Sequence, residues 1–254
     1  MRKAALVLLA IFVASIVPGT FGQDKSADVG WVYATMPKPG MIKQLEEGRK
    51  RHMDFHRKQN DSWTWSVWQI ETGESTGSYY STSFGHSWKD LDAWEEKMGT
   101  ADTADGAANL APYAASTTAS IWEVMKDVSR SPKDEEPPKL AQVNHFLLKP
   151  GSDRDFNDAI RKITDAINKA NWATNYTWYQ LQDGGEGPHY VLLIYMNGWA
   201  DLAGPEPEFP VMLEKAVGRH DAEALMHSVD QSIKREWTET IRYRPDLSYV
   251  PGHK

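Results

Sequence analysis

The sequence contains no cysteine. Disulfide bonds, thiolate catalysis and cysteine-ligated metals or clusters are therefore excluded. It also has no excess of positive charge, because 35 acidic residues outnumber 28 lysines and arginines and give a formal charge of −7. An acidic chain is a poor match for the phosphate backbone, so we expect no nucleic-acid partner.

Motifs of the common catalytic classes are missing as well. The sequence has no H-E-x-x-H motif, no EF-hand loop, no phosphate-binding glycine loop and no nucleophile elbow. His52 and His56 lie four residues apart on a predicted helix, a spacing that can bind a metal. A repeat described below sets Ile163 opposite His52, so we interpret His52 as a packing residue and His56 as a surface residue. The sequence therefore predicts no metal site.

Only one long apolar run is present, over residues 4–17, and it follows Arg2 and Lys3. It is short for a membrane span, and Pro18-Gly19 ends it. We predict a signal peptide over residues 1–22, with an uncleaved N-terminal anchor as the alternative. The mature chain is then expected to be secreted or periplasmic, in a bacterium, with no membrane span left.

One stretch of the chain is written twice. Lys38-Pro39-Gly40 recurs as Lys149-Pro150-Gly151, and the same sequence offset relates Trp88 to Trp199. Many matches in one register, on glycine, proline and tryptophan, indicate a duplicated structural unit. The predicted units are a first repeat over residues 23–130, a proline-rich linker over 131–140 and a second repeat over 141–250.

Both repeats show the same order of predicted elements. Apolar periodicity and turn residues predict four strands in each repeat. They lie at residues 31–36, 63–71, 78–86 and 118–125, and at 143–148, 175–182, 189–196 and 238–243. A helix follows each first strand, and Ser87 is the predicted N-cap of the next helix in the first repeat. This strand–helix–strand–strand–helix–strand order predicts an α+β fold of two ferredoxin-like (βαββαβ) repeats.

The sequence resembles the dimeric α+β barrel superfamily in four features, each present twice. They are a first strand that ends in Lys-Pro-Gly, an amphipathic helix, an aromatic strand pair and a Trp-x-Asp-Leu motif. Within this superfamily, the NIPSNAP-like proteins are the most similar. The resemblance covers residues 30–250 and implies an intramolecular barrel, that is, a monomeric pseudo-dimer. Cofactor-independent monooxygenases and haem-binding or haem-degrading enzymes belong to this superfamily. None of their catalytic motifs matches this chain, so no active site is carried over.

Aromatic and amide side chains alternate on one face of the second strand of each repeat. They are Trp65 and Gln69 in the first repeat and Tyr176, Trp178 and Gln180 in the second. If this face points into the barrel, two amides and several rings would line a cavity for a planar organic ligand. Packing between the sheets, without a cavity, is the alternative.

His145 is the candidate catalytic residue, because it lies on a predicted first strand where the other repeat has Ala34. An imidazole suits proton transfer near neutral pH, and it is also a haem ligand. A strand histidine that is simply hydrogen-bonded is the alternative.

Together these features predict an exported protein that binds a small apolar or aromatic molecule between its two sheets. A cofactor-independent monooxygenase or a haem-handling enzyme is one alternative, and a non-catalytic protein that acts through its surface is another. No cofactor is predicted, and haem is the one that the resemblance leaves open.

Overall fold

The computed structural model describes residues 28–131 and 137–252. The predicted signal peptide and the middle of the predicted linker, residues 132–136, lie outside the described residues. Within these ranges, no helix combines the length and the apolar character needed to cross a membrane.

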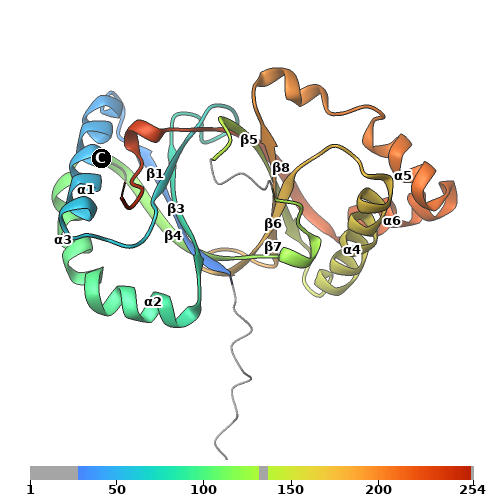
Figure 1. The fold of residues 1–254 in the computed structure, drawn as a ribbon, viewed down its shortest axis with the longest axis horizontal. Coiled ribbons are helices and arrows are strands. Elements are labelled where there is room, and N and C mark those ends of the chain that lie inside the picture. Colours follow the sequence, from blue (N-terminus) through green and yellow to red (C-terminus); the bar gives the residue numbers. More distant parts are fainter. Residues whose placement is uncertain (1–27, 132–136, 253–254) are drawn as a thin grey trace, which may run out of the picture.

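Eight antiparallel strands form one closed barrel at the centre of the molecule (Figure 1). They are β1 (Val29–Pro37), β2 (Ser66–Ile70), β3 (Tyr79–His86), β4 (Ala114–Val124), β5 (Leu140–Leu148), β6 (Tyr176–Asp183), β7 (His189–Met196) and β8 (Ile233–Tyr243). Their order around the barrel is β1-β3-β2-β8-β5-β7-β6-β4. The first four strands therefore pair in the order β4-β1-β3-β2, and the last four in the matching order β8-β5-β7-β6.

Helices cover the outside of the barrel in two groups, on opposite sides of it (Figure 1). The first group is α1 (Ile42–Lys58), α2 (Trp88–Trp94) and α3 (Thr100–Asn109), with a π-helical turn, η1 (Glu95–Gly99), between α2 and α3. The second group is α4 (Asp153–Ala170), α5 (Phe209–Val217) and α6 (Arg219–Ser232), and the turn η3 (Trp199–Ala203) stands where the first half has α2. The helices pack against outward-facing strand residues; Trp178 and Tyr190, for example, contact Phe156 of α4. The inner faces are left for the barrel interior.

The end of each half of the chain crosses onto the other half. After β4, Val128 of the turn η2 (Lys126–Val128) is fully buried against α4, where Thr164 Oγ1 donates a hydrogen bond to its carbonyl at 3.2 Å. After β8, the turn η4 (Pro245–Leu247) packs against α1, and the Tyr249 hydroxyl donates to the Asp61 carbonyl at 2.7 Å. These reciprocal contacts hold the halves together beyond the strand pairs that close the barrel.

The predicted N-cap at Ser87 is confirmed. Its hydroxyl accepts a hydrogen bond from the Asp90 amide at 3.2 Å, and the Asp90 carboxylate accepts one from the Ser87 amide at 2.8 Å, which is a capping box. Ser152 holds the N-cap position of α4 but makes no side-chain capping bond. These two serines are therefore a matched pair.

We expect Ser87→Ala to lower the free energy of unfolding by about 1 kcal/mol, the usual contribution of a capping side chain. Ser152→Ala should lower it clearly less, because no bond is lost. Urea denaturation followed by circular dichroism measures both values. Equal losses in the two variants would contradict this assignment of the cap.

Candidate functional site: the cavity of the barrel

The barrel contains a cavity of about 710 Å³, lined by inward-facing side chains from all eight strands. Tryptophan, tyrosine, valine and leucine side chains form much of its wall. An exposed ion pair between Arg235 and Glu74, whose Nη2 and Oε2 atoms are 3.3 Å apart, lies at its rim. The cavity is therefore largely apolar inside and opens to solvent beside this pair.

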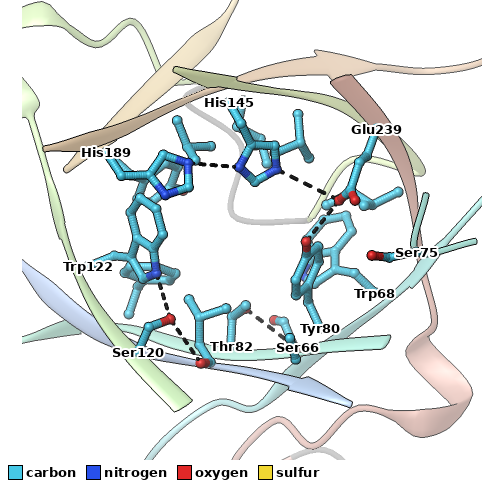
Figure 2. Close-up of a pocket in the computed structure, with 18 of the residues that line it drawn as sticks. Ser66, Trp68, Ser75, Tyr80, Thr82, Ser120, Trp122, His145, His189 and Glu239 are labelled. Carbon is cyan, nitrogen blue, oxygen red and sulfur yellow. Dashed lines mark hydrogen bonds and ion pairs between the residues drawn. The ribbon is translucent and has the colours of Figure 1, made fainter. Parts of the chain in front are cut away.

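One corner of the cavity is polar (Figure 2). The Nδ1 atom of His145 lies 3.2 Å from Nε2 of His189, and its Nε2 atom lies 3.7 Å from Oε2 of Glu239. The Tyr80 hydroxyl donates a hydrogen bond to the same Glu239 oxygen at 2.8 Å. Strands β3, β5, β7 and β8 thus bring four polar side chains together, and they come from both halves of the chain.

Aromatic contacts fix this corner in place. The His145 ring stacks on Trp237, with centroids 4.5 Å apart and planes 5° from parallel. The His189 ring meets Trp122 edge-on at 5.0 Å, and Trp122 Nε1 donates to Ser120 Oγ at 2.8 Å. Because each ring is held by its neighbours, the imidazoles keep one orientation with little freedom to rotate.

Burial controls the protonation of this corner. Burial, together with the neighbouring His145, lowers the pKa of His189 to about 4, so His189 is neutral at pH 7. Burial and the adjacent Glu239 raise the pKa of Tyr80, so its hydroxyl stays a hydrogen-bond donor. Glu239 is only 4% exposed, and its ion pair among the described residues is with His145.

The Nε2 atom of His145 is buried and makes no hydrogen bond within the described part of the chain. Its 3.7 Å separation from Glu239 is too long for a direct hydrogen bond. Leaving such an atom without a partner costs about 1–3 kcal/mol. A polar atom of a ligand placed between His145 and Glu239 would bond to both.

Of the predicted site residues, His145 lies in the cavity. Trp65 and Gln69 instead face outward from β2. Trp65 Nε1 donates to Asp61 Oδ2 at 3.0 Å, and Gln69 Oε1 accepts from Arg244 at 2.7 Å. The inward face of β2 carries Ser66 and Trp68, so the condition under which Trp65 and Gln69 would line the cavity is not met.

The same correction holds for β6. Tyr176 and Trp178 are buried in the outer core against α4, and Gln180 alternates onto their face, while Tyr179 lines the cavity. These three residues therefore lie outside the cavity that they were predicted to line. Both strands are buried on their two faces, so alternation does not reveal which face is inside.

Sequence reasoning missed Trp237 because it began the last strand at residue 238, and it did not single out Glu239 within that strand. Strand β8 in fact begins at Ile233, and Arg235, Trp237 and Glu239 alternate inward along it. The sequence signal for this strand was the alternation that places Trp237 and Glu239, two residues apart, on the same face. Extending the strand toward α6 would have revealed it.

Haem was raised as a ligand of His145, and the residues present do not suit it. His189 contacts Nδ1, and Nε2 is directed toward the Glu239 carboxylate, on the side where an iron would have to lie (Figure 2). Trp237 covers the ring. As arranged, His145 offers no free axial ligand, and no cofactor is assigned.

No family model and no curated protein matches this sequence. Solved structures do match it. A "putative monooxygenase" from Fusobacterium nucleatum has a TM-score of 0.57 at 11% identity, over 86% of this chain and 93% of that one. An anthrone oxidase-like protein has a TM-score of 0.53 at 10% identity, over 91% and 96%. A mutant chlorite dismutase from Candidatus Nitrospira defluvii has a TM-score of 0.51 at 8% identity, over 86% and 92%.

Identities this low show the fold alone. The predicted fold is confirmed: the chain has the dimeric α+β barrel fold that these structures share.

Proposed function

We propose that this protein binds a small, planar and mainly apolar molecule inside the barrel, with one hydroxyl-type group held between His145 and Glu239. The observation that carries the proposal is a largely apolar cavity of about 710 Å³ with a buried polar corner at His145 and Glu239. Ligand sites commonly combine apolar walls with a few placed polar groups in this way. His145 Nε2, which makes no hydrogen bond within the described residues, marks where the ligand's polar atom sits.

The wall chemistry favours an aromatic ligand. Trp68, Trp122 and Trp237 all line the cavity, and their ring faces stack well on planar molecules. At the corner, the Glu239 carboxylate accepts hydrogen bonds and the Tyr80 hydroxyl already donates to it. A ligand group that donates, such as a phenolic hydroxyl, therefore suits this corner better than a carboxylate, which Glu239 would repel.

Ala34 gives a direct test, because it lines the cavity and is only half-buried. We expect Ala34→Phe to fill the binding space and weaken the affinity for 1-naphthol by at least about tenfold, which is about 1.4 kcal/mol. Quenching of tryptophan fluorescence measures the affinity. Ala119→Phe is the matched control, since Ala119 lies exposed on the adjacent strand β4 and does not line the cavity. Equal affinities in the two variants would refute the proposed location.

The neutral state of His189 gives a second test. Its folded-state pKa of about 4 lies below the ordinary 6.5, so the unfolded chain takes up the proton first as the pH falls. Stability is therefore complete above pH 6.5 and is lost as the pH falls toward 4. We expect His189→Gln to reduce this acid-side loss in denaturant titrations at several pH values. His220→Gln, on the exposed surface of α6, should leave the pH profile unchanged; a reduced loss in that variant would contradict the assignment.

A second candidate function is oxygenation without a cofactor, favoured by His145 Nε2, which makes no hydrogen bond within the described residues and lies next to the Glu239 carboxylate. In this reaction His145 removes a proton from an activated methylene carbon, the resulting carbanion adds O₂, and the imidazolium returns the proton to give a hydroperoxide. Loss of water from the hydroperoxide leaves a ketone, so that one methylene and one O₂ give one carbonyl and one water. Stacking on Trp237 would hold the imidazole at the reacting carbon, and the apolar walls would exclude water.

Anthrone is a suitable probe for this second candidate, because it is planar and carries an activated methylene. We expect the full chain to accelerate O₂ uptake with anthrone, and His145→Gln and Glu239→Gln each to reduce kcat by about 10²–10⁴-fold, the usual range for a lost general base. Ala119→Phe should keep the wild-type rate. Uptake that is equal in wild type and His145→Gln would leave binding alone as the function. A Soret band that forms with haem and disappears in His145→Gln would contradict both candidates.

We also infer that the barrel is a duplicated unit fused to itself, a single-chain counterpart of a dimer. The equal strand order of the two halves supports this, and so does the constant offset of the repeat, which relates Val29 to Leu140 at the starts of β1 and β5. A narrower kinship with NIPSNAP-like proteins and export by the signal peptide belong to the same proposal. N-terminal sequencing of the protein from its host tests the cleavage.

A further inference from the structure

We propose that His52, His56 and Asp102 form a binding site for a divalent transition-metal ion such as Zn²⁺, on the outside of the barrel between α1 and α3. The site is distinct from the cavity and does not depend on the function proposed for it. Imidazole nitrogens and a carboxylate oxygen are the ligands that Zn²⁺ prefers where cysteine is absent.

The three side chains approach one another closely, with their ligand atoms all within 4.8 Å of one another. Asp102 Oδ1 lies 3.4 Å from His52 Nε2 and 3.3 Å from His56 Nε2. Two ligands bonded at about 2.0 Å to one tetrahedral ion are about 3.3 Å apart, so these separations suit a shared metal.

The contacts between these atoms are not hydrogen bonds. Asp102 Oδ1 is buried and makes no hydrogen bond within the described ranges, although two imidazole nitrogens lie close to it. Lone pairs that face one another in this way leave the oxygen unsatisfied. A cation between them would satisfy all three atoms at once.

Each histidine is oriented by a second carboxylate on its other nitrogen. His52 Nδ1 lies 2.8 Å from Asp105 Oδ1, and His56 Nδ1 lies 2.9 Å from Asp61 Oδ2. This places the proton on Nδ1 and the lone pair on Nε2, as carboxylate partners do for metal-bound histidines. Asp61 is itself held by the indole nitrogen of Trp94, at 3.2 Å.

A packing role explains this cluster poorly. In the second half of the chain, the repeat sets Ile163 and Ile167 opposite His52 and His56, and both isoleucines pack in an apolar core. The first half instead surrounds two histidines with three carboxylates.

The helix arrangement brings the ligands together and leaves the site reachable. Gly48 permits a close approach of α1 and α3, because a Cβ there would lie 2.0 Å from the Asn109 carbonyl oxygen. The π-helical turn η1 directly precedes α3, which carries Asp102. The Asp102 side chain is 20% exposed, against 1% for His56, so an ion enters from the Asp102 side. Three protein ligands leave one position open to water or a small anion.

The test is metal binding by the full chain after chelator treatment and dialysis. Competition with a chromophoric chelator should show one tightly bound Zn²⁺ per chain, and Co²⁺ should give the visible absorption bands of a low-coordinate site. We expect Asp102→Asn, which keeps the side-chain shape, to weaken Zn²⁺ binding by at least about 100-fold, because a charged ligand is lost. Circular dichroism confirms that this variant is folded, and His52→Gln serves as the second ligand variant.

Two controls separate this site from other histidines. The double variant His220→Gln/His227→Gln removes two exposed histidines of α6 and should bind Zn²⁺ as the wild type does. His145→Gln removes the cavity imidazole and should also keep the affinity. The proposal is overturned if Asp102→Asn binds as tightly as the wild type, if either control loses the ion, or if the wild type binds none.

Discussion

The closure of the barrel is the constraint on which the cavity depends. Two four-stranded sheets meet along β2 and β8, where Trp68, Gln69 and Ile70 pair with Tyr243, Arg242 and Ile241, and along β4 and β6. Open edges of this kind would leave backbone groups unpaired and the inner faces wet. The crossed chain ends add the contacts that the short β2–β8 seam lacks, with Val128 buried in one half and Leu247 in the other. β5 and β8 pair directly and hold His145 near Glu239, and the β2–β8 seam then brings Tyr80 of the first sheet to Glu239 of the second.

Closure also explains how far the sequence predicts this fold. The types and order of the elements follow from apolar periodicity, turn residues and the repeat, and β7 (His189–Met196) has the predicted bounds. The inward face does not follow, because helices cover the outer face and the opposite sheet covers the inner one. Trp65 and Trp68 lie on opposite faces of the strand and are both buried. The residue types therefore do not tell which of the two faces points into the barrel. The polar side chain of Gln69 suggested a ligand-binding group in the cavity, but its amide oxygen accepts a hydrogen bond from Arg244 on the outer side of the barrel.

Both candidate sites lie where the two halves of the chain differ. His145 stands opposite Ala34, and His52 and His56 stand opposite isoleucines, so comparison of the repeats locates the histidines. It does not locate their partners. Asp102 follows a π-helical turn, whereas the second half has η3 and a loop before its next helix, so these segments do not match residue by residue. Glu239 lies on β8, which has left the register of the repeat and begins later than the offset from β4 would place it.

The two sites share one physical feature, a buried polar atom without a hydrogen-bond partner among the described residues, but they differ in charge. In the cavity, His145 Nε2 faces one carboxylate that already receives the Tyr80 hydroxyl, so a neutral ligand with a donor group completes the set. On the outside of the barrel, Asp102 Oδ1 belongs to one of three carboxylates that surround two histidines. A neutral molecule there would leave the negative charge of the Asp102 carboxylate uncompensated. Burying an uncompensated charge costs far more than burying a neutral polar group. The charge balance therefore favours an organic molecule in the cavity and a cation between α1 and α3.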